Sequence, residues 1–486
     1  MEQLLLTAYL PVLMLLAGAG VLQAYRLLRP GLAALFVRIF TTLLLAAAGA
    51  GEVLIVHGLT APKAPHGGIL PMQWGVLDGI GFWYTMGALA LGCVVMWCRP
   101  TQERSGSVEA YTGVLVLLST AWLAALARTT QTGVAVALLA VVAVTMMAAL
   151  LHEKSYEDVA AAVGRMGSDL AVAMALLILG MSGCVLTSGT ADLALLGGAS
   201  HLAPLAIVSW GMMLAGLSWF FQMHPFGGWR FQMPWRTEST AVALVTGSGV
   251  LAGTLMLFRL AVPLAGTVAT AVMCEVGALL LVNGCAVALR SLRHDSLLRL
   301  GEGTGTMAVA LMVGTTAFAG ASHEAAAGIT VAMLAALGGG VLLPFTVLLL
   351  RTAAQESGSD LSGDSLHAGL GGSRWHAALF GVSLAACAGL PPFPVFFLGM
   401  MGILDGVGTP YAWCAGALLF VWCTGMGASW VVLHALARAE GGRKAGAHTA
   451  RMPQIAGGMV CAAVFGVMVT AGLIGRIVDT LTVVLR

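Results

Sequence analysis

The residues of this chain that could do chemistry are a few ionisable side chains set in long apolar stretches. His224 ends an apolar run in the segment Gln222-Met223-His224-Pro225, and Glu275 lies inside the run 267–289. Ionisable groups at membrane depth are costly, by about 2.5–3.5 kcal/mol each on insertion scales, and often mark ion paths. Histidine titrates near neutral pH, and a buried carboxylate changes its protonation with its neighbours. His224 and Glu275 are therefore candidates for carrying protons.

Both residues also have a structural interpretation. His224 can be a capping or interfacial histidine at the entrance of a loop. Glu275 can form an ion pair with Arg38 or Arg259, or it can contact a neighbouring subunit. These interpretations stay open beside proton carriage.

The other acidic residues in apolar runs lie near the ends of those runs. Glu52 falls near the end of the second run and Glu302 near the start of the tenth, so we expect both at interfaces with headgroups or loop water. The nine cysteines include no C-x-x-C pair and fall mostly in apolar runs, so a disulfide framework or metal site is not expected.

The elements that position these groups are predicted to be membrane helices. Of the 486 residues, 59% are hydrophobic and 9% are charged, and the mean hydropathy is +0.93. This composition indicates an all-α polytopic membrane protein. Runs long enough to cross a hydrocarbon core of about 30 Å predict about 14 transmembrane helices, at 4–24, 31–57, 79–97, 107–127, 131–151, 166–187, 202–223, 238–260, 267–289, 303–321, 325–350, 375–404, 411–437 and 455–483.

The basic residues alternate from loop to loop. Seventeen of the 23 Lys and Arg residues fall in or beside odd-numbered loops, which therefore face the cytoplasm or matrix. Both termini are expected on the opposite side, the periplasm or intermembrane space. The net charge of +2 is small and dispersed, so nucleic acid is not an expected partner.

Two predicted helices are interrupted by proline. Pro391, Pro392 and Pro394 break the twelfth helix, and Pro225 breaks the seventh. Proline lacks a backbone N–H, and irregular backbone at membrane depth persists only where protein or a wet cavity surrounds it. Two broken helices five apart, in inverted orientation, predict two inverted five-helix repeats.

The chain resembles the antiporter-like subunits of respiratory complex I (NADH:quinone oxidoreductase), specifically subunit N in bacteria and subunit 2 in mitochondria. The resemblance covers about residues 77–438 and rests on the order and spacing of several segments: Gly216-Leu217-Ser218-Trp219-Phe220, His224-Pro225-Phe226 with Trp229, Leu257-Phe258-Arg259-Leu260, Val282-Asn283-Gly284, Asp364-Ser365-Leu366 and Gly389-Leu390-Pro391-Pro392.

The resemblance implies proton translocation driven by quinone reduction elsewhere in the complex. It implies other membrane-arm subunits and the lipid bilayer as partners, in a mitochondrial inner membrane or a bacterial cytoplasmic membrane. This chain would hold no cofactor, and NADH, flavin, iron–sulfur clusters and quinone would bind in partner subunits. It also implies one antiporter-like domain over residues 1–486, with N-terminal helices in 1–106, repeats at 107–260 and 267–437, and a last helix at 455–483.

The sequence departs from the family at its proton path. The family has a glutamate in the fifth helix and lysines in the seventh, eighth and twelfth helices. The matching positions here hold Leu139, Phe220, Val250 and Gly399. The chain has only three lysines, all in loops: Lys63, Lys154 and Lys444.

Three functions remain in view. The first is a complex I membrane-arm subunit that links the quinone module to distal pumps without the lysine-based relay. The second is a pumping subunit in which His224 and Glu275 replace the lost groups. The third is a stand-alone secondary cation/proton antiporter. An apolar central axis favours the first, a hydrated axis favours the second, and isolation as an active free chain favours the third.

Overall fold

The computed structural model describes most of the chain up to residue 439. The described residues are 2–28, 34–60, 71–72, 75–76, 79–98, 106–151, 157–196, 203–261, 269–293, 296–321, 325–358, 361, 374–390, 393–407 and 412–439. The predicted last helix, 455–483, lies outside them, as do Pro391 and Pro392.

The described residues are almost entirely helical. The helices are α1 (Glu2–Leu28), α2 (Ala34–Thr60), α3 (Gly79–Trp97), α4 (Gly106–Arg128), α5 (Thr132–Leu151), α6 (Glu157–Ser188), α7 (Ala203–Leu217), α8 (Ser239–Ala261), α9 (Ala269–Arg293), α10 (Leu297–Ala321), α11 (Ala325–Leu337), α12 (Leu343–Ser357), α14 (Arg374–Cys387), α15 (Pro394–Val407) and α16 (Ala412–Ala439). Two short strands, β1 (Pro71–Met72) and β2 (Gly75–Val76), form a small antiparallel pair. The fold class predicted from the sequence, an all-α polytopic membrane protein, is confirmed.

Among the described residues, ten helical segments are long and apolar enough to cross a membrane, and three shorter apolar helices accompany them. Helices suit this environment because each satisfies its own backbone hydrogen bonds away from water. The shorter helices include Pro204–Leu217 in α7 and Val395–Leu404 in α15, next to the two predicted breaks.

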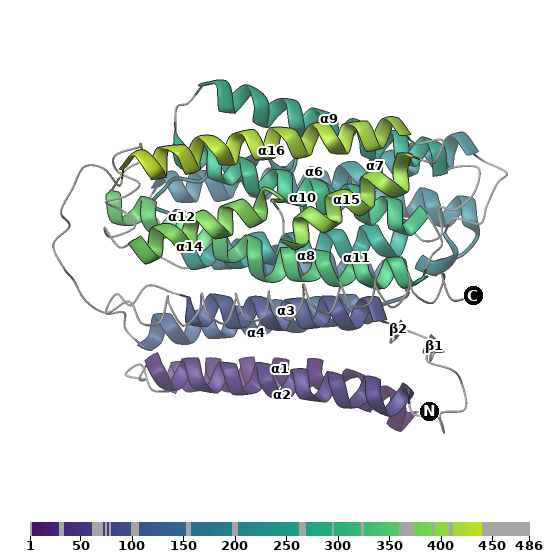
Figure 1. Ribbon diagram of the computed structural model, residues 1–486. Helices are drawn as coiled ribbons and strands as arrows, with labels where there is room; N and C mark the ends of the chain where they lie inside the picture. Colours follow the sequence, from purple (N-terminus) through teal and green to yellow (C-terminus); the bar gives the residue numbers. More distant parts are fainter. Residues whose placement is uncertain are drawn as a thin grey trace, which may run out of the picture.

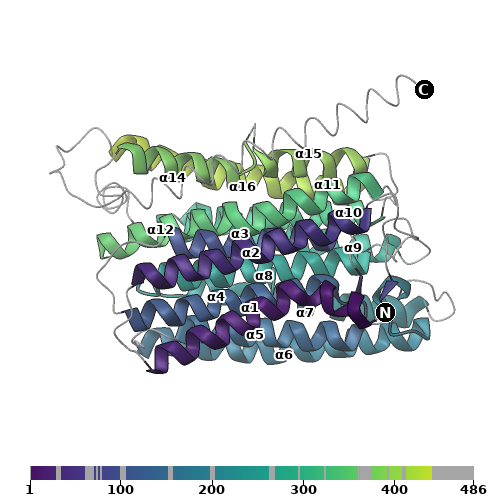
Figure 2. The same ribbon diagram turned by 90° about the horizontal axis from the view of Figure 1, so that it is seen from below.

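The helices lie roughly parallel in stacked layers (Figure 1). The purple helices α1 and α2 form one outer layer, α3 and α4 lie next to them, and α9 and α16 lie on the opposite side. Figure 2 shows the same bundle from below, with α1 and α2 crossing in front of the inner helices. The core lies around α8 and α10, and α10 is buried from Leu300 to Phe318.

The predicted eleventh helix, 325–350, is not uniform. Between α11 and α12 the chain forms a π-helical turn, η4 (Gly338–Leu342), which lies against α3 and α8. Helix α12 then ends at Ser357 and is capped by Gly358, whose φ of +69° suits glycine and whose N–H donates to the carbonyls of Ala354 and Gln355.

Small residues bring α3 and the α11–η4 turn into backbone contact. A Cβ added at Gly87 would lie 2.7 Å from the carbonyl oxygen of Ala336, and Gly340 lies directly against the Gly87 backbone. Small residues permit such close approach between membrane helices. No apolar side chain fits at position 87 without separating the two segments.

We therefore expect Gly87→Leu to destabilise the protein by about 1–3 kcal/mol, the usual cost of overpacking a core. The measurement is the thermal unfolding midpoint of the purified protein in detergent. Gly416→Leu is the matched control, because Gly416 is exposed and a Cβ there meets no atom within 4 Å. Equal midpoints for the two variants would contradict the close contact.

Candidate functional site

The four positions at which the resemblance implied ionisable groups lie in the interior of the fold. Leu139 of α5, Phe220 after α7 and Val250 of α8 are all 0% exposed. A Cβ at Gly399 of α15 would already lie 3.3 Å from the indole ring of Trp422. The central positions are thus filled by apolar side chains, and the fourth is closed by a neighbouring tryptophan.

The break in the seventh predicted helix begins before its proline. Helix α7 ends at Leu217, so Pro225 lies eight residues beyond the helix, and a short 3-10 helix, η2 (Gly227–Gln232), follows it. Gln222 has a positive φ of 58°, which is unusual for a residue other than glycine. Its side-chain amide donates to the Thr246 carbonyl at 3.2 Å, which fixes the segment against α8.

Aromatic packing holds the rest of this irregular segment. The Trp219 indole is fully buried, donates to the Met166 carbonyl of α6 at 3.2 Å, and lies 5.9 Å from the Trp229 ring. A Cβ at Gly227 would overlap the backbone of Gln222, so only glycine allows this tight turn. The segment is therefore surrounded by protein, the first of the two settings that tolerate irregular backbone in a membrane.

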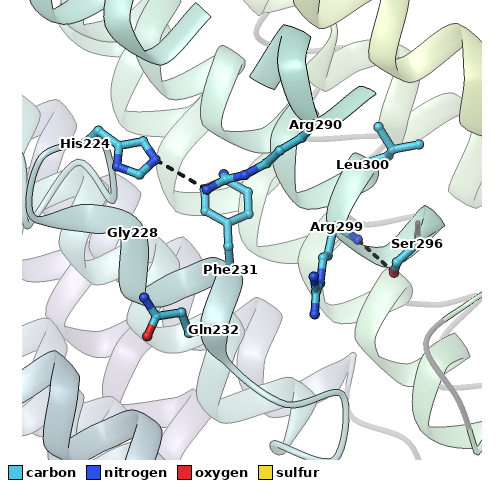
Figure 3. A pocket seen from close by; sticks show the side chains of 8 residues that line it. All are labelled: His224, Gly228, Phe231, Gln232, Arg290, Ser296, Arg299 and Leu300. Atoms are coloured by element: carbon cyan, nitrogen blue, oxygen red, sulfur yellow. Dashed lines mark hydrogen bonds between the residues drawn. The ribbon is translucent and has the colours of Figure 1, made fainter. Parts of the chain in front are cut away.

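His224 is held at the end of this segment by α9. Its backbone N–H donates to Asn283 Oδ1 at 2.8 Å, and Asn283 Nδ2 donates to its carbonyl at 3.2 Å. Its Nε2 lies 3.3 Å from Arg290 Nη2, as the dashed line in Figure 3 shows. Burial and the Arg290 guanidinium lower the pKa of His224 below its ordinary value of 6.5. The neutral ring can then accept a hydrogen bond from Arg290.

The lowered pKa of His224 predicts a pH dependence of stability. The stabilisation that the neutral His224 ring gives the folded protein is complete above the ordinary pKa of 6.5. It is lost as the pH falls through the lowered pKa of the folded state. We expect the thermal midpoint of the native protein to fall over this acid window more than that of His224→Gln, whose amide oxygen accepts but does not titrate. Parallel pH profiles for the two proteins would contradict this role.

Glu275 lies in α9, away from His224. Its carboxylate faces α7, where a Cβ at Gly211 would lie 3.1 Å from Oε1, and its Oε2 is buried without a hydrogen bond to any described residue. Asn283 of α9 is the residue that binds His224. Glu275 lies eight residues before Asn283, which is about 12 Å along the helix. The structure does not bring the two candidate proton carriers together.

The ion-pair partners expected for Glu275 are engaged elsewhere. Arg38 Nε donates to Glu109 at 2.6 Å, and Arg259 Nη2 donates to the carbonyl of Ala127 at 2.8 Å. Within the described part of the chain, Glu275 forms no salt bridge. A direct ion pair with either arginine is therefore wrong.

Sequence reasoning missed a buried charge cluster of Arg230, Glu302 and Arg351, which we call the central triad. Arg230 and Arg351 are 0% exposed and Glu302 is 1% exposed. Glu302 pairs with Arg351, which also donates to the Pro234 carbonyl at 2.7 Å. Arg230 lies beside the same turn of α10, and none of its guanidinium nitrogens has a hydrogen-bond partner among the described residues.

The central triad corrects two expectations. Glu302 does not face headgroups or loop water, and Arg351 lies within α12 and not in the loop after it. The sequence signal was present at Arg351, which directly continues the apolar run Val347-Leu348-Leu349-Leu350. The expectation for Glu52 was also wrong, since it is buried and paired with Arg128.

The twelfth predicted helix is divided between α14 and α15. Helix α14 ends at Cys387, Gly389 follows with a φ of +75°, and α15 begins at Pro394. Proline suits a first helical position because the N–H it lacks would have no partner there. Trp422 Nε1 of α16 donates to the Gly389 carbonyl at 3.1 Å, which satisfies one backbone group of the break.

Solved structures share this fold. A chain of respiratory complex I from Thermus thermophilus with bound aureothin has a TM-score of 0.72 and 16% identity, covering 96% of this chain and 98% of that one. A chain of the membrane-bound sulfane sulfur reductase, an archaeal respiratory membrane complex, has a TM-score of 0.76 and 14% identity, covering 96% and 94%. A chain of the Mrp complex from Dietzia sp. DQ12-45-1b has a TM-score of 0.66 and 15% identity, covering 91% and 81%.

No protein-family model matches the chain, and no curated protein matches it in sequence. Identities of 14–16% show a common fold. The chain is thus an integral membrane protein with the fold of these respiratory and Mrp-complex chains, and its role has to be argued from its own residues.

Proposed function

We propose that this chain is a membrane-arm subunit of a complex I-type NADH:quinone oxidoreductase, equivalent to subunit N or 2. In this proposal it links the quinone-reducing module to distal pumping subunits and does not itself carry the lysine-based proton relay. The fold shared with a chain of complex I over nearly the full length supports the assignment.

The absence of the lysine-based relay is inferred from one observation. The three core positions that would hold ionisable groups, Leu139, Phe220 and Val250, are apolar and 0% exposed. A proton relay needs groups whose charge can change, or water between them, and fully packed leucine, phenylalanine and valine side chains supply neither. The replacement carriers do not form a chain, because Glu275 lies about two helical turns of α9 away from Asn283, the residue that binds His224.

The domain organisation belongs to the same proposal. Two inverted five-helix repeats at 107–260 and 267–437 fit the placement of the breaks, after α7 in one repeat and between α14 and α15 in the other. In this arrangement both termini face the periplasm or intermembrane space. NADH, flavin, iron–sulfur clusters and quinone bind in partner subunits, and this chain binds none of them.

Purification from native membranes in a mild detergent tests the proposal. We expect the tagged chain to migrate with NADH dehydrogenase activity on a native gel. A free chain that exchanges cations for protons in liposomes would instead establish the stand-alone antiporter. Within the complex, Glu275→Gln and His224→Gln should leave the number of protons pumped per electron unchanged, and a fall in that number would favour the pumping alternative.

A further inference from the structure

A cavity of about 250 Å³ lies beside His224, between the irregular segment after α7 and the junction of α9 and α10. We call it the basic pocket. Figure 3 shows the side chains around it, which come from three elements: His224, Gly228, Phe231, Gln232, Arg290, Ser296, Arg299 and Leu300. The two arginines bring two positive charges to one hollow, and none of the eight lining residues is acidic.

Arg290 is fixed in a position to bind an anion. Its guanidinium carbon lies 3.6 Å from the centre of the Phe231 ring, and Nη2 faces His224. Its Nη1 is buried and has no hydrogen-bond partner among the described residues. A buried N–H donor without a partner is costly, so this nitrogen is ready to bind an oxygen atom.

Arg299 and Ser296 complete the donor set. The Arg299 side chain is exposed, and the hydroxyl of Ser296, 3.4 Å from the Arg299 backbone nitrogen, can donate to a ligand. Guanidinium groups bind phosphate oxygens in a two-pronged geometry that ammonium groups cannot reproduce. Arginine donors around a hollow without acidic lining residues therefore suit a phosphate group and disfavour a cationic ligand.

The outer face of α9 adds an exposed apolar surface beside the turn that carries Arg290. Val282 and Leu289 are 55% and 63% exposed, and they lie seven residues apart on one side of the helix that carries Arg290. In a membrane protein such a surface faces acyl chains or another subunit. A phosphate carried by a lipid could thus rest its chains on α9 while its head group enters the hollow.

From these contacts we propose that the basic pocket binds a phosphate group, through Arg290, Arg299 and Ser296, and that the group is the head of an anionic phospholipid. Basic pockets between membrane helices are suited to such head groups. The proposal does not depend on the assignment to complex I, because it rests on the pocket alone.

The test uses the purified full chain, together with any subunits that co-purify with it, after delipidation. Three probes are compared for binding. Dioleoyl phosphatidic acid carries both phosphate and acyl chains, dioleoylglycerol carries only the chains, and inorganic phosphate carries only the phosphate. Binding is followed by native mass spectrometry and by the thermal midpoint. We expect phosphatidic acid to bind and to raise the midpoint and dioleoylglycerol to do neither. Binding of inorganic phosphate with equal affinity would support the phosphate site and overturn the lipid as its source.

Two variants separate the pocket from general charge effects. Arg299→Gln changes an exposed side chain and should weaken phosphatidic acid binding about tenfold, as expected for one charge-assisted hydrogen bond. Arg290→Gln should weaken it at least as much. Arg236→Gln, which removes an exposed charge outside the pocket lining, is the control and should bind as the native protein does. Equal binding by Arg299→Gln and the native protein, or equal binding of dioleoylglycerol and phosphatidic acid, would overturn the proposal.

Discussion

Replacing Glu302 with glutamine is expected to destabilise the protein by about 3–5 kcal/mol, the usual cost of breaking a buried ion pair. Glu302 is the carboxylate of the central triad, in which Arg230 and Arg351 are both fully buried. Without it, two guanidinium groups remain in the interior, and only Arg351 has a described backbone acceptor, the carbonyl of Pro234. The measurement is the thermal midpoint in detergent, together with the yield of folded protein.

Glu109→Gln is the matched control for Glu302→Gln. Glu109 also pairs with an arginine, but its partner Arg38 has a side chain that is 13% exposed, so water can compensate part of the loss. We expect a clearly smaller shift for Glu109→Gln. Equal shifts would mean that the central triad stabilises the protein no more than this partly exposed pair does.

A double variant tests whether Arg230 depends on Glu302. Arg230 has no hydrogen-bond partner among the described residues, so Glu302 supplies its compensating charge. Adding Arg230→Gln to Glu302→Gln should therefore restore part of the lost stability, since one uncompensated charge is removed. If the loss of stability in the double variant equals the sum of the losses from Arg230→Gln alone and Glu302→Gln alone, the two residues are not coupled.

Placing a lysine at Val250 is expected to be the second most damaging change, although the complex I subunits that the sequence resembles carry a lysine in the corresponding helix. Val250 is 0% exposed, and its side chain packs against the π-helical turn at Gly339. A lysine at the centre of a membrane helix costs about 2.5–3.5 kcal/mol on insertion scales. We expect Val250→Lys to lower the thermal midpoint and the yield.

Val250→Met separates charge from size in this test. Methionine is unbranched like lysine but uncharged, and it adapts to irregular gaps. It should therefore lower the thermal midpoint less than lysine does. The comparison distinguishes an apolar axis from a hydrated one. If Val250→Lys were as stable as Val250→Met, water would have to reach position 250, and the pumping alternative would gain support.

Local sequence properties predicted much of the fold. Membrane helices are recognised by the length of an apolar run, which needs no knowledge of tertiary contacts. Helices α3, α4, α5 and α8 accordingly lie within one or two residues of their predicted ranges. The absence of lysine from the apolar runs is equally a property of composition, because the chain has only three lysines and all lie in predicted loops.

The limits of the broken helices were harder to predict. Proline marks a residue that cannot continue a helix, but it does not show how far before it the helix ends. Helix α7 ends at Leu217 because tertiary contacts of Trp219 and Gln222 fix the following residues in another conformation. The π-helical turn after α11 likewise depends on the glycine contact with α3.

The sequence alone determined that this is an α-helical membrane protein with proline-interrupted helices and without a lysine in any apolar run. Only the tertiary structure decided which charges are buried and which meet. Arg351 and Glu302 are 49 residues apart, and Arg128 and Glu52 are 76 apart. Hydropathy is a local property of the chain, whereas the pairing of charges depends on which helices pack together. Tertiary packing therefore placed the central triad in the core and formed the basic pocket around His224.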